Sequence, residues 1–285
     1  MTGTCRDRYG AGIEAAVWGT FMLRLGVIGA GAIGAHVIEL VARDLADRVV
    51  IPAVLVRRPR PESPGPRLLA DPEAFHAEAF DVVLEGAGHQ AVRDHVPRLL
   101  ERGVDVIMTS IGALTDDALH DRCRRAAEAG GATLTLASAG IGALDILSGA
   151  AIGGLDAVEM VVRKDPSAWY GTAAEGEFDL AAMTEPTVIF EGSAREGAAT
   201  YPQNVNISAA VALAGIGLDR TRLTIVADPT IDTHVIEVRA RGAFGSFTFV
   251  EDVAVAEENR KTGKIVAMAV AKTVRQLVSP VRIGG

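Results

Sequence analysis

The chain has 285 residues, of which 49% are hydrophobic and 22% are charged, and its formal net charge is −8 at pH 7. Its length exceeds the usual size of a single domain, so we expect two domains, each with a sizeable core. The acidic balance argues against a nucleic-acid or anionic membrane surface, because both require clustered positive charge. The composition therefore favours a protein that acts on small molecules.

The two cysteines, Cys5 and Cys123, have neither CxxC spacing nor a histidine cluster nearby. Neither a disulfide framework nor a metal site is indicated, and a reducing, cytoplasmic setting is the simpler interpretation. Residues 1–21 carry Glu14 within their most hydrophobic part and make a poor signal peptide. We expect a disordered extension or an overlong start-site choice there. The sequence has no run of the ~18 to 20 apolar residues that span a bilayer.

An apolar strand, a glycine-rich turn and a helical pattern follow this extension. The turn has the spacing G-x-G-x-x-G between a strand and a helix, which is the context that makes the motif meaningful. Gly29 permits the tight turn, Gly31 lets the backbone approach a pyrophosphate, and Gly34 lets helix and strand pack closely. Ala32 and Ile33 open the helix, whose unpaired N–H groups favour phosphate. We predict a dinucleotide-binding unit, the alternative being a structural glycine turn in another α/β fold.

Strands and helices then alternate as far as residue 137. Apolar runs predict buried strands at residues 49–56, 80–84, 104–109 and 134–137, and helical patterns lie at residues 91–102 and 115–129. The alternation implies right-handed crossovers and a Rossmann-type, doubly wound parallel sheet. We therefore predict an α/β fold whose dinucleotide-binding domain spans residues 22–137.

The pattern changes in the second half of the chain. It predicts a helix at residues 144–153, three strands at 157–162, 187–191 and 223–227, and an antiparallel hairpin of residues 233–241 and 245–255. We expect a second, smaller α+β domain over residues 138–256. A last helical pattern at residues 264–277 is expected to return to the first domain, which residues 257–285 complete.

The end of the second strand bears on the choice of cofactor. NAD-preferring units carry an acid about 20 positions beyond the glycine motif, whereas a nearby arginine suits the 2′-phosphate of NADP. This chain has no such acid and instead has Arg57 and Arg58. We expect NAD or NADP as cofactor and favour NADP acceptance, with both arginines on the phosphate. The alternative is a solvated basic loop.

Six further segments follow in chain order, and we describe them by their letters: EGAGH at residues 85–89, SIGAL at 110–114, SAGIGALD at 138–145, RKDPSAW at 163–169, YPQNVN at 201–206 and DPTIDTH at 228–234. Together with the glycine motif, their order and spacing resemble the L-aspartate dehydrogenase family over nearly all of residues 23–277. The resemblance implies a homodimer with a Rossmann cofactor domain and a smaller domain, residues 138–256, for substrate and dimerisation. It also implies NAD(P)-dependent oxidation of L-aspartate to iminoaspartate, which hydrolyses to oxaloacetate and ammonia or supplies NAD biosynthesis.

The resemblance also assigns site residues by position. His234 matches the family's catalytic histidine, Asn204 its cofactor-contacting asparagine, and Gly140 the cofactor-contacting alanine of a Ser-Gly-Ala-Ile-Gly motif. Here the order is Ser-Ala-Gly, which retains a backbone contact without the alanine methyl group. Arg260 stands where the family's Asn-Pro-Lys-Thr segment has proline, so the rigidity of that loop is expected to differ.

The residues around His234 allow a separate assessment. Ile236 and Val238 share its face of a strand, which by itself favours a half-buried structural histidine. Asp228 and Asp232 precede it closely enough for one of them to orient the ring, and imidazole suits proton transfer near neutral pH. With the resemblance added, we interpret His234 as the group that accepts a proton from the substrate ammonium.

Several alternatives stay open. Asn204 either orients the nicotinamide carboxamide or caps the next helix, for which Asn206 is the better candidate. Lys164 is a candidate partner for a substrate carboxylate, or a solvated surface lysine. His89 lines the cofactor crevice, or else has a capping or surface role. The protein is alternatively a reductase of another imino acid, similar to dihydrodipicolinate reductase, or a non-catalytic NAD(P)-binding sensor. No metal-ligand cluster or Ser/His/Asp triad competes in the sequence.

Overall fold

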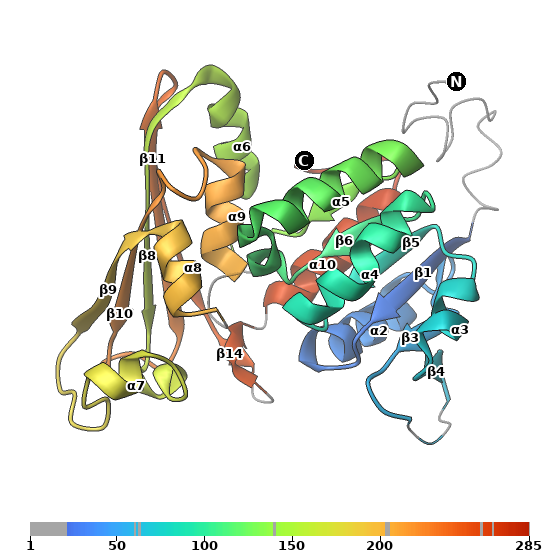
Figure 1. Cartoon of the computed structure of the whole chain (residues 1–285), viewed down its shortest axis with the longest axis horizontal. Helices are drawn as coiled ribbons and strands as arrows, with labels where there is room; N and C mark the ends of the chain where they lie inside the picture. The colour runs from blue at the N-terminus through green and yellow to red at the C-terminus, as the bar shows by residue number, and fades with distance from the viewer. Residues whose placement is uncertain are drawn as a thin grey trace.

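The computed structural model describes residues 22–59, 61, 64–138, 141–202, 206–256, 259–263 and 265–284. These residues form two sheets, a parallel one enclosed by helices and a mixed one with helices on one face (Figure 1). The predicted fold class is therefore confirmed. Residues 1–21, for which we predicted an extension, lie outside the described residues. Within the described part, no helix has both the length and the apolar character needed to cross a membrane.

The first sheet is parallel, with the strand order β4-β3-β1-β5-β6-β7. Its strands are β1 (Leu23–Ile28), β3 (Ala53–Leu55), β4 (Arg67–Leu69), β5 (Val82–Glu85), β6 (Asp105–Met108) and β7 (Leu134–Leu136), and the short β2 (Val49–Val50) pairs with β1. This is the Rossmann order, in which β3 and β4 lie on one side of β1, and β5, β6 and β7 lie on the other side. The carboxyl ends of β1 and β5 therefore meet where such folds bind ligands.

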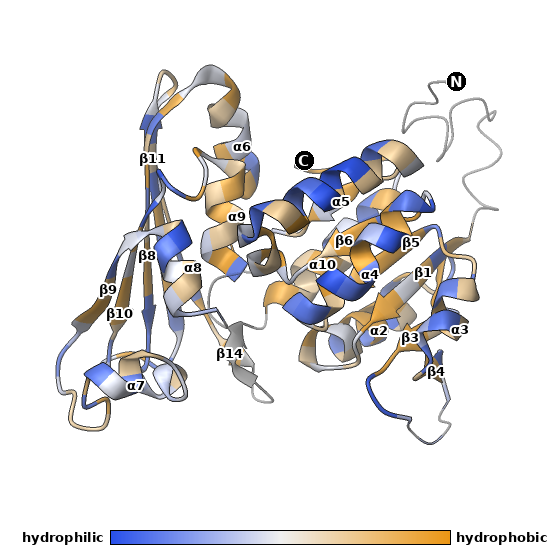
Figure 2. Cartoon of the chain, viewed as in Figure 1, coloured by the Kyte–Doolittle hydropathy of each residue, from blue (hydrophilic) through white to orange (hydrophobic). Residues whose placement is uncertain are grey.

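Helices cover both faces of this sheet. They are α2 (Ala32–Asp44), α3 (Pro72–Ala77), α4 (His89–Glu101), α5 (Asp117–Gly130) and the C-terminal α10 (Ile265–Leu277). Buried residues of α2 and α10 share one core with β1, whereas α4 and α5 belong to a second core on the other face. Figure 2 shows the orange, hydrophobic strands between helices whose outward faces are hydrophilic. The C-terminal helix thus packs on the first sheet, against α2.

Two local features differ from the prediction. The strand expected at residues 49–56 is divided into β2 and β3, because Pro52 lies at the break and has no N–H for a sheet ladder. Neither β4 nor α3 was predicted from the sequence pattern. A cap begins α3, since the Asp71 carboxylate accepts a hydrogen bond from Glu73 N–H at 3.0 Å and Pro72 occupies the first helical turn.

The second sheet is mixed, with the strand order β12-β11-β8-β10-β9. Its strands are β8 (Leu155–Lys164), β9 (Thr187–Ser193), β10 (Arg222–Ala227), β11 (His234–Gly242) and β12 (Gly245–Val253). The pair β8 and β10 is parallel, and the other neighbours are antiparallel. The remaining elements are η1 (Ile111–Thr115), α6 (Leu144–Gly153), η2 (Pro166–Trp169), α7 (Ala174–Glu177), α8 (Ala194–Thr200), α9 (Asn206–Ala214), β13 (Val255–Ala256) and β14 (Asn259–Gly263).

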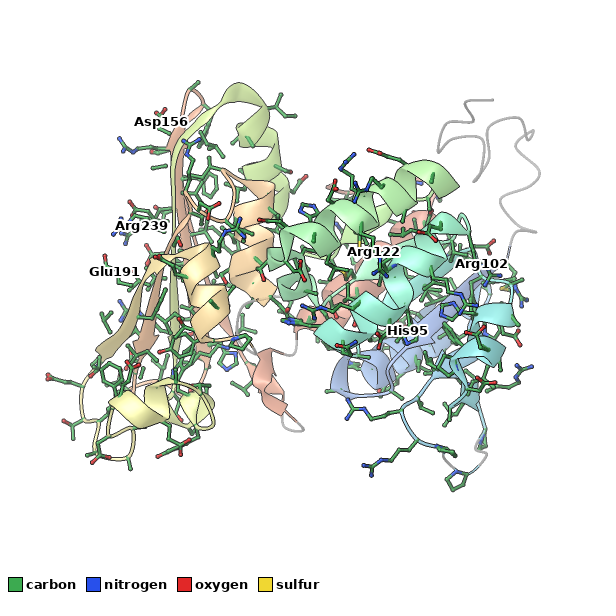
Figure 3. The ribbon with its side chains drawn as sticks, viewed as in Figure 1. His95, Arg102, Arg122, Asp156, Glu191 and Arg239 are labelled. Atoms are coloured by element: carbon green, nitrogen blue, oxygen red, sulfur yellow. The ribbon has the colours of Figure 1, made fainter. Side chains whose placement is uncertain are left out.

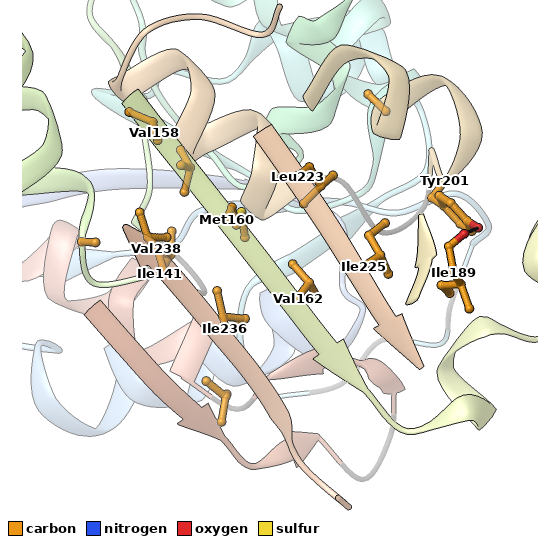
Figure 4. Packing of buried hydrophobic residues seen from close by; sticks show 14 of the residues in the cluster. Ile141, Val158, Met160, Val162, Ile189, Tyr201, Leu223, Ile225, Ile236 and Val238 are labelled. Carbon is orange, nitrogen blue, oxygen red and sulfur yellow. Dashed lines mark hydrogen bonds between the residues drawn. The ribbon is translucent and has the colours of Figure 1, made fainter. Parts of the chain in front are cut away.

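The face of the second sheet that turns towards α6, α8 and α9 is apolar. Alternate residues of β8, β11 and β10 point into the core there, as Figure 4 shows for Met160, Val162, Ile236 and Ile225. The opposite face has no described element over it and carries charged side chains such as Arg239 (Figure 3). We call these the inner and the outer face.

One helix, α9, joins the two sheets. Its Ala209 and Ala210 belong to a core of the first sheet, while Val211 belongs to the core of the second sheet. The helix also contacts η1, which follows β6 of the first sheet. A helix that is apolar on all sides is one that is buried, and α9 is buried between the two sheets.

Candidate functional site

A cleft of about 840 Å³ lies at the carboxyl ends of β1, β3 and β5. Its lining includes the glycine turn from Gly29 to Gly31, the end of β3 and residues of α4. Ligands of open α/β sheets bind outside the carboxyl ends of the strands, at the point where the strand order reverses. In this sheet that point lies between β1 and β5. The size and place of the cleft fit a dinucleotide.

The three motif glycines differ in what surrounds them. Gly29 has φ of +99°, a conformation that disfavours other residues, and a Cβ there would lie 2.9 Å from the carbonyl oxygen of Gly86. A Cβ on Gly34 would lie 2.0 Å from the carbonyl oxygen of Gly29, so the helix can pack this closely only with glycine. Gly31 faces open space. Of the three glycines, Gly31 is therefore the one whose backbone faces the open cleft and can be approached by a ligand.

The first turn of α2 is available to an anion. Gly31 is the N-cap, no side chain accepts from the N–H groups of this described turn, and no acid lies within it. Ala32 and Ile33 begin the helix directly after the glycine turn. Uncapped N–H groups and the positive end of the helix dipole suit a pyrophosphate at this position.

Arg57 and Arg58 follow β3, and both line the same cleft. Their side chains are exposed. Two guanidinium groups at this position can donate several charge-assisted hydrogen bonds to a phosphate. The predicted arginines are therefore on the cleft.

Glu85 supports the loop at the end of β5. Its buried carboxylate accepts hydrogen bonds from Ala87 N–H at 2.8 Å, Gly88 N–H at 3.0 Å and the Ser110 hydroxyl at 2.9 Å. Burial raises the pKa of Glu85, and these hydrogen bonds work in the opposite direction. The segment at residues 85–89 is thus held against the start of η1.

His89 connects this loop to the second sheet's helices. Its Nε2 lies 3.1 Å from Oδ1 of Asn206, which also accepts a hydrogen bond from Gly112 N–H at 2.9 Å. Because an amide oxygen only accepts, Nε2 is the donor in this pair. Asn206 begins α9, yet its side-chain oxygen accepts hydrogen bonds from residues of α4 and η1, which pack on the first sheet. The contact joins α4, η1 and α9 beside the cleft's edge of the sheet.

Lys164 and His234 lie together at one end of the second sheet. His234 is the first residue of β11 and Lys164 the last of β8, and they are register partners in the antiparallel ladder. Both side chains are buried, with exposed fractions of 3% for Lys164 and 4% for His234. The alternative of a solvated surface lysine is therefore wrong. β8 continues beyond the predicted end at residue 162 and carries Lys164 into the sheet.

An aromatic residue contributes to the surroundings of Lys164. The Nζ of Lys164 lies 5.6 Å from the ring centroid of Trp169, within the range of a cation–π interaction. Trp169 packs edge-on against Tyr201, with ring centroids 5.7 Å apart, and the Tyr201 hydroxyl donates to the carbonyl of Ile189 at 3.2 Å. The segments at residues 163–169 and 201–206, far apart in the sequence, thus meet. Asn204 and Gly140 lie outside the described residues.

The acids that precede His234 have different positions. Asp228 is buried, and its Oδ1 accepts from the Thr230 N–H at 2.9 Å and the Thr230 hydroxyl at 2.6 Å, while Oδ2 lies 3.7 Å from Arg163. The Asp228 N–H donates to the Lys164 carbonyl at 2.8 Å. Asp228 therefore shapes the turn that leads to His234. Asp232 is exposed.

One residue of this region, Glu251, was not among the candidates predicted from the sequence. On β12 it shares the inner face with Phe249 and Val253, and Val253 is the register partner of His234. The signal was an acid at an inward position of an alternating strand, but it becomes meaningful only once the register of β11 and β12 is known. In the described part of the chain, no grouping of His, Cys, Asp or Glu is arranged to hold a metal ion.

Two family profiles match the chain. Residues 29–137 match the profile described as homoserine dehydrogenase, NAD binding domain, and residues 145–277 match that described as aspartate dehydrogenase, C-terminal. The first match coincides with the sheet that carries the glycine turn. The second contains Lys164, His234 and Glu251.

Known proteins resemble the chain over most of its length. The L-aspartate dehydrogenase of Ralstonia nicotianae is 42% identical over 260 residues, covering 89% of this chain and 97% of that protein. Among solved structures, the aspartate dehydrogenase of Thermotoga maritima superposes with a TM-score of 0.72 at 24% identity, covering 92% and 99% of the two chains. A dihydrodipicolinate reductase from Paenisporosarcina superposes with a TM-score of 0.52 at 19% identity, covering 90% and 95%. The structural likenesses show a shared fold.

Proposed function

The chain belongs to the L-aspartate dehydrogenase family of NAD(P)-dependent oxidoreductases, and from this premise we propose that it oxidises L-aspartate to iminoaspartate. The observation that carries the proposal is the pairing of Lys164 with His234 at the end of the inner face. A buried cation beside a buried imidazole suits a substrate that has carboxylates to hold and an ammonium group to deprotonate.

His234 acts as the acid and base. The substrate amine must lose a proton before Cα can release a hydride, and the His234 ring accepts that proton. The bound nicotinamide supplies the hydride acceptor. In hydrolysis of the imine, the same ring can activate a water molecule. The burial of His234 supports this role, because a site closed to bulk water strengthens the electrostatic effect of each neighbouring charge.

Lys164 binds a carboxylate of the substrate. The ammonium group of Lys164 is buried beside His234, and a cation at this place can bind one of the two carboxylates of aspartate. The face of Trp169 limits where the Lys164 side chain can lie. This arrangement supports recognition of the substrate at a fixed distance from His234.

NAD or NADP would bind across the glycine turn. Gly29, Gly31 and Gly34, with Ala32 and Ile33, would hold the pyrophosphate, and Arg57 and Arg58 would hold the 2′-phosphate of NADP. The cleft at the end of β3 supports this assignment. Gly140 and Asn204 would contact the cofactor, as the family resemblance implies, and Asn204 would orient its nicotinamide carboxamide. Residues 22–137 with 257–285 form the cofactor domain, and residues 138–256 the substrate domain.

The active form is a homodimer that pairs through the outer face of the second sheet. This face is uncovered in the described chain and exposes Val188 and Val250, at 52% and 57%. Asp156, Glu191 and Arg239 also lie on this side (Figure 3). A twofold axis places each charge opposite a complementary one only if the patch is self-complementary, and its mixed signs permit this. Light scattering of wild type and Val250→Glu tests the arrangement, since a monomeric wild type contradicts it.

The imine leaves for hydrolysis to oxaloacetate and ammonia or for NAD biosynthesis, within the cytoplasm. The test of the activity is the absorbance of reduced nicotinamide with L-aspartate and NAD or NADP at alkaline pH. Aspartate-dependent reduction supports the proposal. A cofactor-binding protein without turnover would instead be a sensor, and turnover confined to another imino acid would make it a reductase like the dihydrodipicolinate enzyme.

A further inference from the structure

Glu251 is an acid on a sheet face that is otherwise apolar up to its last rows. In the register of β11 and β12, Glu251 opposes Ile236, and Val253 opposes His234. Glu251 and His234 are therefore diagonal neighbours on one face of an antiparallel pair. Such neighbours lie ~7–8 Å apart between Cα atoms, a distance that long and aromatic side chains bridge.

One carboxyl oxygen of Glu251 is free to accept a hydrogen bond. Its Oε1 is buried and has no hydrogen-bond partner in the described structure. Burial raises the pKa of Glu251 to about 7, and a hydrogen bond from Gly142 N–H works in the opposite direction. Glu251 as a whole is half-buried, but a buried carboxyl oxygen without a hydrogen bond is costly unless a ligand or a neighbouring group uses it.

The charged groups near Glu251 can be named element by element. On β11 the titratable neighbour is His234, and on β8 Lys164 lies beyond it in the same row. The segment before α6 contributes the backbone of Gly142. The other inward neighbours on β11 and β12 are apolar. The carboxylate of Asp228, which is buried, already accepts from Thr230 and faces Arg163.

Gly142 also fixes where Glu251 lies relative to the cofactor. Gly142 belongs to the connection between β7 of the first sheet and α6, which packs on the second sheet. The carboxyl end of β7 is at the same edge of the sheet as those of β1 and β5, because all three strands are parallel. Glu251 is thus at the junction of the cofactor edge and the His234 end of the inner face.

We propose that Glu251 is a positioning residue whose carboxylate orients the imidazole of His234 and stabilises the imidazolium formed when His234 accepts the substrate proton. The proton passes from the ammonium nitrogen to a ring nitrogen of His234, and Glu251, which is ionised above pH 7, stays ionised there and forms no covalent bond. A negative charge at this range increases the proton affinity of the ring. The inference rests on the proposed function.

The direct test is an NMR titration of the histidine ring protons in the full chain without substrate. Glu251→Gln removes the charge and keeps the shape, and His234→Asn identifies the His234 signal. We expect Glu251→Gln to lower the proton affinity of His234 about tenfold. Asp252→Asn is the matched control, because Asp252 is exposed on the outer face of the same strand, and it is expected to leave the His234 signal unchanged. Equal titrations in both variants would overturn the proposal.

Kinetics supply a second readout. With L-aspartate, Glu251→Gln is expected to lower kcat about tenfold and to shift the pH dependence of kcat, with the KM for the cofactor unchanged. Glu251→Asp retains the charge and is expected to recover part of the rate. If Glu251→Gln does not fold, the same titration is made with Glu251→Asp. The proton affinity of His234 is then expected to change by less than tenfold, and no change at all would contradict the role. If wild type does not oxidise L-aspartate, the proposed function fails, while the titration still decides the contact between Glu251 and His234.

Discussion

Lys164 and His234 are direct partners across β8 and β11, and both are buried at the open end of an apolar sheet face. Each lies at the terminus of its strand, where the ladder ends and the backbone turns away. The sheet core behind them fixes their spacing. The strand termini, rather than a flexible loop, therefore hold the two groups that the proposed reaction needs.

Replacement of His234 by asparagine is expected to lower kcat with L-aspartate by roughly 10²- to 10⁴-fold, because the proton acceptor is lost. Cofactor affinity is expected to be unchanged, since His234 is not among the residues of the cleft. Steady-state kinetics and a fluorescence titration with NADPH measure the two quantities. Undiminished turnover would show that His234 is not the base.

Replacement of Lys164 by methionine keeps the length of the side chain and removes its charge. We expect the KM for L-aspartate to rise roughly 10- to 100-fold, because a buried charge partner of a carboxylate is lost. Arg125→Gln is the control, since it removes an exposed positive charge from α5, which packs on the first sheet. Similar KM values in both variants would assign Lys164 a structural role.

The glycine motif permits a paired test. Gly34→Ala places a Cβ 2.0 Å from the Gly29 carbonyl oxygen, and we expect a loss of about 3 kcal/mol or more in the free energy of unfolding. Gly31→Ala meets no atom within 4 Å, so its folding stability should stay near wild type while cofactor affinity falls. Thermal unfolding and cofactor titration separate the two effects. A stable Gly34→Ala would contradict the close packing.

Arg57 and Arg58 are expected to determine the preference for NADP. Changing both to glutamine removes charge-assisted hydrogen bonds worth about 1.5–3 kcal/mol each, so the Kd for NADP should rise at least tenfold. The Kd for NAD should change little. Arg122→Gln, on α5, is the matched control. An equal loss for both cofactors, or for neither, would assign the arginines to the solvated surface.

His76 makes stability depend on pH. Burial, with Arg98 and His95 nearby, lowers the pKa of His76 from 6.5 to about 4, and its Nε2 lies 3.2 Å from Nδ1 of His95. The unfolded chain binds more protons than the folded chain between these two values, so the free energy of unfolding falls as the pH decreases from 6.5 to 4. Chemical denaturation of His76→Gln should show a shallower decline. An unchanged slope would exclude this source.

The longest elements were predictable because their patterns are local. The helix at residues 144–153 agrees at both ends with α6, since Gly154 follows it with φ of +95°. The glycine turn was equally clear from its flanking strand and helix. By contrast, β4 has three residues and no period of its own, so its pairing with β3 gives it a place in the sheet.

The site divides in the same way. His234 could be singled out by its neighbours and by the resemblance, and Arg57 with Arg58 by their distance from the glycine motif. Lys164 was misjudged because its burial depends on the two additional residues of β8 and on Trp169. Glu251 depends on the pairing of two strands, which no single segment of sequence contains.

The placement of α9 between two cores bears on how the protein melts. Because Ala209 and Ala210 fill the core of the first sheet and Val211 fills that of the second, displacement of α9 removes side chains from both cores at once. Neither sheet therefore keeps a complete core without the other. The two halves are therefore expected to unfold in a single cooperative transition, although each has its own sheet. A fragment ending at residue 137 would expose the apolar surface of η1 and is expected to aggregate.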